Sequence, residues 1–386
     1  MGISAREDGQ SKADPARRRI LLLGSYAPSL VNFRGPLIRE MVARRHEVIA
    51  AAPAVDDSTA ERIRGLGAEP VSVPLSNASL DPVEMLRSYR ALRSLVRERR
   101  PDVIISYTIK PVIVGALVGR SEGLRVVSLI TGLGFAFTGD KMRGRRGLVR
   151  RVAAFLYRLA VSRSDVTLFQ NRDDEALFRQ LGILPPTRRS AVVDGSGVDI
   201  DHFAPVPLPP APSFLMIARL LRDKGVREYA AAASRLRSEH PEVRVALVGY
   251  LDPSPDSLTA ADLEEIVAGG VEFIGRLEDV RPAIAESSVY VLPSYREGTP
   301  RSVLEAMAMG RPIITTDAPG CRETVVEGAN GLLVPVGDAF SLYAAMKRFV
   351  LDPSLCGPMG AESRQMVERR YDARKVAADI LRHADL

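Results

Sequence analysis

Several residue types that often carry chemistry are scarce in this sequence. It has no tryptophan, two cysteines and four histidines among 386 residues. Cys321 and Cys356 form neither a metal-ligand spacing nor a disulfide framework, which fits a reducing cytoplasm. No stretch reaches the roughly 20 apolar residues that a membrane span needs, because the nearest candidate is broken by Lys110 and Pro111. Zinc sites, disulfide scaffolds and integral membrane segments are therefore not expected.

Charge is unevenly spread along the chain. Residues 1–205 hold 32 basic and 22 acidic side chains, whereas residues 206–386 hold 21 and 25. This asymmetry indicates that the first half meets an anionic surface or substrate. Residues 1–17 are polar and charged without an apolar core, so we expect a disordered lead-in rather than a signal peptide.

Apolar runs of strand length alternate with helical patterns, which predicts parallel sheets with crossover helices. Five prolines between His202 and Pro212 separate two such series and fit a stiff linker. The predicted fold class is α/β, with two doubly wound, Rossmann-like domains. Its parts are an N-terminal domain at 18–203, a linker at 204–212, a C-terminal domain at 213–362 and a final helical segment at 363–386.

The most informative segment follows a predicted strand at 289–292 and reads SYREGTPRSVLEAMAMGRP over residues 294–312. Thr299 suits a helix cap and Pro300 the first helical position. The amides of Arg301 and Ser302 then lie at a helix N-terminus, where free N–H groups and the helix dipole favour an anion. This segment therefore predicts a phosphate site.

Four charged side chains surround the predicted phosphate site. Glu297 and Glu305 place two carboxylates beside it, where they can hold hydroxyls of a group attached to the phosphate. Arg219 and Lys224 follow a predicted strand at 213–218, at the sheet edge where ligands of open α/β folds bind. A guanidinium and an ammonium can neutralise a diphosphate without a metal. Taken singly, each pair could equally be solvated surface charge; together they predict a nucleotide-sugar site.

These segments resemble the motifs of the family-4 glycosyltransferases over nearly the whole chain. Glu297 and Glu305 match E-x7-E, residues 219–225 match R-L-x-x-x-K-G, and residues 331–335 match the closing G-L-L-V-P. The resemblance implies two Rossmann-like domains facing each other across a cleft, the GT-B arrangement, with a last helix that crosses back to the first domain. It also implies a retaining, metal-independent transfer without a cofactor. In this family, Glu297 would hold the donor sugar and Glu305 the ribose. The implied catalytic residues are Glu297, Arg219 and Lys224, and the implied donor-binding residues are Glu305, Gly298, Thr299, Pro300, Arg301 and Ser302.

The first loop departs from the commonest family pattern. Many members carry a glycine pair where this chain has N-F-R-G at 32–35. That segment, with Y-T-I-K-P at 107–111 and T-G-L-G at 131–134, resembles a subgroup that builds bacterial surface glycans on a lipid carrier. These loops follow predicted strands and should line the acceptor side of the cleft, although Arg34 could instead pair with a nearby carboxylate. The implied acceptor-side residues are Asn32, Arg34, Lys110, Thr131 and Gly132.

Histidines offer little support for a general base. All four fall outside the loops expected at the cleft, namely His46, His202, His240 and His383. The family's proposed retaining route, in which the leaving phosphate takes the acceptor's proton, fits this scarcity.

The segment from Lys141 to Ser164 holds eight basic residues and no acidic one. Its apolar residues fall on one helical stripe and its arginines on another, a pattern typical of a helix at an anionic membrane surface. The alternative is an ordinary amphipathic helix packed on its own sheet. The predicted membrane-facing residues are Arg143, Arg150, Arg151, Phe155 and Arg158.

We therefore expect a glycosyltransferase at the inner face of the cell membrane. It would move an N-acetylhexosamine from a UDP-sugar to a polyprenyl-diphosphate-linked glycan in surface polysaccharide or glycoprotein glycan assembly. Nucleic acid is not an expected partner, because no aromatic-rich basic strand accompanies the charge. The alternatives are a sugar-nucleotide epimerase of the same fold and a non-catalytic membrane-associated scaffold. A dinucleotide oxidoreductase would need G-x-G-x-x-G after a first strand, which is absent.

Overall fold

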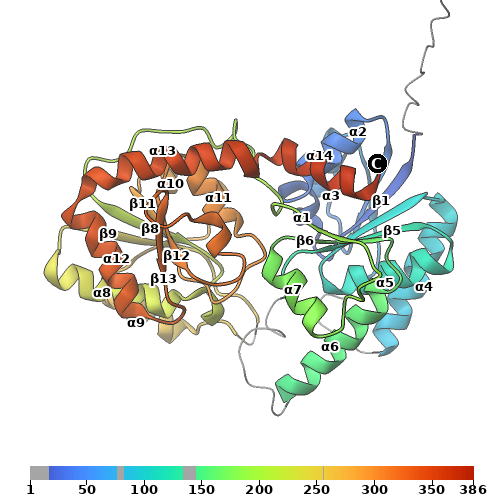
Figure 1. Ribbon diagram of the computed structural model, residues 1–386, viewed down its shortest axis with the longest axis horizontal. Coiled ribbons are helices and arrows are strands. Elements are labelled where there is room, and N and C mark those ends of the chain that lie inside the picture. Colours follow the sequence, from blue (N-terminus) through green and yellow to red (C-terminus); the bar gives the residue numbers. More distant parts are fainter. Residues whose placement is uncertain (1–16, 76–81, 134–144, 255) are drawn as a thin grey trace, which may run out of the picture.

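The computed structural model describes residues 17–75, 82–133, 145–254 and 256–386. Within these residues the chain forms two α/β domains that lie side by side (Figure 1). The N-terminal sheet has the strand order β3-β2-β1-β4-β5-β6-β7 and the C-terminal sheet β10-β9-β8-β11-β12-β13, all parallel. In each sheet the order reverses beside the first strand of the domain, as in doubly wound folds. The predicted fold class is confirmed. The predicted lead-in falls, but for residue 17, outside the described residues.

Helices of the N-terminal domain lie on both faces of its sheet (Figure 1). Its strands are β1 (Arg19–Leu23), β2 (Glu47–Ala52), β3 (Glu69–Ser72), β4 (Val103–Tyr107), β5 (Arg125–Ile130), β6 (Val166–Phe169) and β7 (Ser190–Val192). Its helices are α1 (Ala27–Asn32), α2 (Gly35–Ala43), α3 (Asp57–Gly65), α4 (Pro82–Arg99), α5 (Ile109–Ser121), α6 (Arg145–Val161) and α7 (Arg172–Gln180).

The C-terminal domain repeats the alternation after the proline-rich linker. Its strands are β8 (Ser213–Ile217), β9 (Arg244–Val248), β10 (Glu272–Gly275), β11 (Val289–Leu292), β12 (Ile313–Thr316) and β13 (Gly331–Val334). Its helices are the 3-10 turn η2 (Arg222–Lys224), α8 (Val226–Glu239), α9 (Ala260–Ala268), α10 (Arg281–Ala285), α11 (Arg301–Ala308), η3 (Arg322–Thr324), α12 (Ala339–Leu351), η4 (Pro353–Leu355) and α13 (Cys356–Met366).

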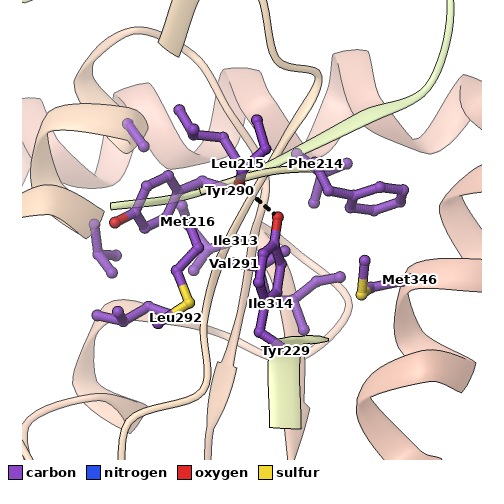
Figure 2. Close-up of a cluster of buried hydrophobic side chains, with 14 of the residues drawn as sticks. Phe214, Leu215, Met216, Tyr229, Tyr290, Val291, Leu292, Ile313, Ile314 and Met346 are labelled. Atoms are coloured by element: carbon purple, nitrogen blue, oxygen red, sulfur yellow. Dashed lines mark hydrogen bonds between the residues drawn. The ribbon is translucent and has the colours of Figure 1, made fainter. Parts of the chain in front are cut away.

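The core of the C-terminal domain holds β8 and β11 side by side, and both strands end at the candidate site. Their apolar side chains pack against those of α8 and α12 (Figure 2). Two buried tyrosines keep their hydroxyls bonded: Tyr229 donates to the carbonyl of Ala246 at 2.9 Å, and Tyr290 to that of Ile217 at 3.1 Å. Because Tyr290 bridges β11 to the end of β8, the loops that leave these strands start from a fixed frame.

Strands β3, β7 and β13 were not predicted. The first two are edge strands in which no residue is fully buried, so they lack the continuous apolar run that marks a central parallel strand. The third is the four-residue G-L-L-V segment, which the sequence analysis treated only as a family motif and which pairs with β12.

The C-terminal segment crosses from the second domain to the first. The final helical segment predicted at 363–386 is not one continuous helix: it contains the end of α13, the π-turn η5 (Val367–Tyr371) and α14 (Ala373–Ala384). Asp372 ends the first part and caps α14 by accepting from the Arg374 amide at 3.0 Å. Helix α14 packs on α2, and its buried residues join the N-terminal core (Figure 1).

Candidate active site

A cavity of about 890 Å³ lies between the two domains. Its walls come from loops at the carboxyl ends of β1, β4, β8 and β11, the edge where parallel sheets bind ligands. Arg219 and Glu305 both line it, and so do the other predicted donor residues except Gly298, whose backbone lies at the contact with the N-terminal domain. The lining includes Glu297, Thr299, Pro300, Arg301, Ser302 and Lys224 from the C-terminal side, and Asn32, Arg34 and Thr131 from the N-terminal side.

Helix α11 begins at Arg301, with Pro300 in the capping position. The prediction that Thr299 caps this helix is wrong. Its hydroxyl instead donates to the carbonyl of Gln170 in the N-terminal domain, at 3.1 Å. The capping residue Pro300 has no side chain that bonds the first amides of α11, so these N–H groups stay free at the end of the helix that faces the cavity. A helix N-terminus lies at Arg301 and Ser302 as predicted, although with a different capping residue, and its binding of a phosphate stays a prediction.

The ammonium of Lys224 lies 2.6 Å from Glu297 Oε1, which also accepts from the hydroxyl of Ser294 at 2.8 Å. Burial lowers the pKa of Lys224, but the neighbouring carboxylates of Glu297 and Asp223 outweigh it and leave the pKa raised. Burial raises the pKa of Asp223. Lys224 therefore stays charged at neutral pH, and a bound phosphate would have to share or replace its carboxylate partner.

Glu305 is held by the first residue of its own helix. The Arg301 Nε donates to Glu305 Oε1 at 2.7 Å, four residues apart on α11. Burial raises the pKa of Glu305, and the Arg301 charge opposes that shift. Arg219, which also lines the cavity, forms a 3.1 Å ion pair with Asp252.

Arg34 is the most unusual cation in the cavity wall. It is 2% exposed, its guanidinium donates to the Ser196 hydroxyl at 3.1 Å and stands 4.7 Å from the ring centre of Tyr107. Its Nε has no hydrogen-bond partner, and no described carboxylate forms an ion pair with it. Burial lowers the pKa of Arg34 to about 10, and the charge of Arg301 adds to that effect. A buried guanidinium without a carboxylate is costly unless an anion completes it.

The other acceptor-side predictions are placed less uniformly. Thr131 and Asn32 line the cavity, and Gly132 faces the backbone of Gly298 at the domain contact. Lys110 does not line the cavity: its buried ammonium lies 4.0 Å from Glu84 of α4. The reason is helical geometry, since Lys110 is the second residue of α5 and points away from the strand end.

The expectation that histidines lie outside the cleft is wrong for His202. The Asp199 carboxylate accepts from the His202 amide at 3.0 Å, and this turn brings the histidine into the cavity wall. The cavity also holds residues that the sequence interpretation missed. Tyr26 and Phe33 present exposed rings, and Arg62 bonds Asn32 Oδ1 at 2.8 Å. Phe33 belongs to the N-F-R-G segment and Tyr26 to the same first loop, so that segment could have indicated them, whereas no local signal indicates Arg62.

Helix α6 carries the predicted basic stripe. Phe155 is 65% and Val152 41% exposed, with the exposed Arg151 and Arg158 beside them in sequence. The opposite face, with Ala153, Tyr157 and Ala160, is buried in the N-terminal core. Arg150 is half-buried, and Arg143 lies outside the described residues. Among the described helices none combines the length and apolar character that crossing a bilayer requires.

Two family models match the chain. The model for glycosyl transferase 4-like domains matches residues 33–195, and that for glycosyl transferases group 1 matches residues 211–352. The chain belongs to the family-4 glycosyltransferases. Together the matched segments contain most of the residues in both walls of the cavity, which makes this cavity the candidate active site of a glycosyltransferase.

Curated relatives include glycosyltransferases of bacterial surface glycans. The chain is 28% identical, over 87% of its length and 90% of the relative's, to N,N'-diacetylbacillosaminyl-diphospho-undecaprenol alpha-1,3-N-acetylgalactosaminyltransferase from Campylobacter jejuni. It is 28% identical to the putative glycosyltransferase EpsD from Bacillus subtilis, covering 81% and 84% of the two chains. Both names favour transfer over the epimerase and scaffold alternatives.

Solved structures share the fold at low identity. Sucrose-phosphate synthase from Thermosynechococcus elongatus superposes with a TM-score of 0.80 at 19% identity, covering 95% of this chain and 98% of that one. Anabaena HepE in complex with UDP-glucose gives a TM-score of 0.74 at 18% identity, covering 96% and 100%. These likenesses confirm the two-domain GT-B fold that the sequence predicts.

Proposed function

We propose that this glycosyltransferase moves an N-acetylhexosamine from a UDP-sugar to a glycan carried on a polyprenyl diphosphate. The observation that carries the proposal is the shared cavity, which joins a donor half with anion-binding chemistry to an acceptor half with an uncompensated buried cation. The Campylobacter relative is named for transferring N-acetylgalactosamine to a diphospho-undecaprenol-linked sugar, and a structural neighbour holds UDP-glucose.

The donor half supplies what a departing nucleoside diphosphate needs. Arg219 and Lys224 would neutralise its oxygens without a metal, and the N-terminal amides of α11 would bind the phosphate nearest the sugar. Glu305 would hold the ribose hydroxyls, and Glu297 those of the transferred sugar. In this scheme the bond from the anomeric carbon to the phosphate oxygen breaks while a bond to the acceptor oxygen forms. The acceptor's proton goes to the leaving phosphate. Because the acceptor oxygen therefore attacks on the face that the phosphate leaves, the anomeric configuration is retained.

The acceptor half supplies a second anion site. Arg34 lies across the cavity from Arg301, close enough for the two charges to interact. We assign Arg34 to the acceptor diphosphate, because the cations of the donor half already have carboxylate partners, at Asp252, Glu297 and Glu305. The exposed ring of Tyr26 at the same wall offers an apolar surface for a sugar face.

A transfer assay tests the function. Purified enzyme is offered UDP-, GDP- and ADP-linked sugars, each with a polyprenyl-diphosphate glycan or with the same glycan free of lipid. We expect turnover only with a UDP-N-acetylhexosamine and the lipid-linked acceptor, and its loss in Glu305→Ala. Melting-temperature shifts with each nucleotide-sugar give an independent readout, since a ligand that binds only the folded state raises the Tm. Equal transfer to the lipid-free glycan would contradict the proposed acceptor.

We further propose that α6 rests on an anionic membrane surface. Exposed Val152 and Phe155 beside Arg151 and Arg158 are suited to the headgroup boundary, where apolar rings insert and arginines meet lipid phosphates. This placement fits an enzyme whose acceptor is anchored in the bilayer, and it corresponds to the inner face of the cell membrane.

Vesicle sedimentation tests the membrane proposal. Arg151→Glu with Arg158→Glu should release the enzyme from vesicles that contain about a third of anionic lipid, and salt should do the same. The matched control is Arg369→Glu with Arg374→Glu, which changes the net charge equally at exposed positions on the C-terminal crossing. If both double variants sediment like the wild type, α6 is not a membrane contact.

A further inference from the structure

The donor loop, residues 293–300 between β11 and α11, is bonded to the opposite domain through Asn171. This residue is 1% exposed and begins α7 of the N-terminal domain. Its Oδ1 accepts from the Asp174 amide at 2.8 Å, which caps the helix. Its Nδ2 donates to the carbonyls of Gly298 at 2.8 Å and Glu297 at 3.3 Å. Helix α7 and the donor loop therefore share one side-chain amide.

A buried ion pair lies beside this amide. Arg296 of the donor loop donates to Asp174, which is 0% exposed in the first turn of α7. Each partner keeps one buried atom without a hydrogen bond, Arg296 Nε and Asp174 Oδ2. Burial raises the pKa of Asp174 against the opposing effect of Arg296. Such a pair adds little net stability to the contact, yet strands a charge if one partner is removed.

Glycines let the two backbones meet at this point. A side chain at Gly298 would collide with the Thr131 carbonyl and the Gln170 side chain, and one at Gly195 would come within 2.7 Å of Thr299 Cβ. The residue after Thr131 is Gly132, which faces the Gly298 amide. The donor loop is therefore enclosed by N-terminal backbone on several sides.

We propose that Asn171 is a positioning residue for transfer, and that with the Asp174–Arg296 pair it sets the sugar-binding shape of the donor loop only when the two domains are closed. The proposal rests on the assignment of Glu297 to the donor sugar. Asn171 touches neither substrate: it acts by holding the carbonyls of Glu297 and Gly298, which lie between the Glu297 side chain and the start of α11.

The chemistry of the contact makes it reversible. When the domains separate, Asp174, Arg296 and the two carbonyls regain water, so opening leaves no charge stranded. When they close, only the paired arrangement avoids that penalty. The contact thus favours one closed geometry over neighbouring ones without holding the domains shut, which suits an enzyme that must admit donor and release nucleotide in each cycle.

Asn171→Asp is the decisive variant, because aspartate caps a helix as well as asparagine does but turns a carboxylate toward two carbonyls. In the ligand-free protein we expect amide hydrogen exchange in the donor loop to accelerate about fivefold or more, the low end of typical coupling between sites. UDP-N-acetylgalactosamine should bind about tenfold more weakly, whereas the affinity for UDP, which lacks the sugar assigned to Glu297, should change less than about threefold. Thr259→Ala, which removes a helix cap outside both α7 and the donor loop, should leave all three values unchanged.

A double-mutant cycle gives a second test that does not depend on Asn171. Asp174→Asn and Arg296→Gln should be strongly non-additive in UDP-N-acetylgalactosamine affinity, because they break one pair. Asp173→Asn, which removes the more exposed ion pair to Arg322, should be additive with Arg296→Gln. Unchanged exchange and affinity in Asn171→Asp would overturn the proposal, as would equal losses for UDP and the UDP-sugar. If the wild type binds no UDP-sugar, the proposed function fails, while the exchange experiment still decides whether Asn171 orders the loop.

Discussion

Replacing Lys224 by methionine separates the stabilising part of the Lys224–Glu297 pair from its binding part. The ammonium and carboxylate lie 2.6 Å apart with 15% and 16% of their side chains exposed. Removing the lysine leaves the Glu297 carboxylate with the Ser294 hydroxyl as its one side-chain partner among the described residues, and facing the carboxylate of Asp223. An unpaired buried acceptor costs about 1–3 kcal/mol, so the Tm of Lys224→Met should fall by several degrees.

The same change removes a cation from the diphosphate. A hydrogen bond to a charged group contributes about 1.5–3 kcal/mol, and each 1.4 kcal/mol is a factor of about ten, so UDP should bind about 10- to 140-fold more weakly. The double variant Lys224→Met with Glu297→Gln removes the stranded charge and should recover most of the Tm without recovering UDP affinity. Calorimetric titration with UDP and thermal unfolding measure the two quantities. UDP affinity within about twofold of the wild type in both variants would refute the donor assignment of Lys224.

Three further predictions follow from single contacts. Burial raises the folded-state pKa of Glu305, so its ionisation destabilises the folded protein as the pH rises from about 4 through the raised value. The Tm of Glu305→Gln relative to that of the wild type should therefore increase over that pH range. A Tm difference that does not change with pH would contradict this prediction. Arg34→Met should leave the Tm unchanged or higher, because it removes an uncompensated buried charge. The KM for the lipid-linked acceptor should rise at least about tenfold, while the KM for the donor stays constant. An equal rise in both KM values would refute the acceptor assignment. Gly195→Ala should lower both the Tm and the transfer rate. Gly182→Ala has a similar positive φ but open space around it, so it should cost only about 1–2 kcal/mol of backbone strain and lower the Tm alone. Equal transfer rates in the two variants would show that no close approach is needed at Gly195.

Much of the fold could be predicted because buried parallel strands can be recognised from the local sequence. Leu21 in β1 and Ile104 in β4 sit in continuous apolar runs and pair directly, and such runs need no partner to be recognised. The donor motifs were equally local, since a strand, a loop and a helix start follow one another over residues 289–305.

What escaped prediction depends on the relation between the domains. Thr299 has the composition of a cap, yet its hydroxyl bonds Gln170, 129 residues earlier in the chain. Lys110 follows a strand end and still points away from the cleft, because helix rotation rather than sequence order decides its direction. The acidic residues in the first turn after Asn171 indicate that it caps a helix. Nothing in the neighbouring sequence indicates that its Nδ2 bonds the donor loop of the other domain.

Helix α14 ties the completion of the first domain to residues that come almost 200 positions after that domain's last strand. Val376, Ala377 and Ile380 cover apolar side chains of the N-terminal sheet, and Asp385 pairs with Arg125 and Arg189. During synthesis, the N-terminal domain leaves the ribosome with this surface uncovered, and the surface stays uncovered until α14 (Ala373–Ala384) has been made. A premature stop near codon 372 would therefore yield a product whose first domain, though fully encoded, exposes a sticky face to chaperones and proteases.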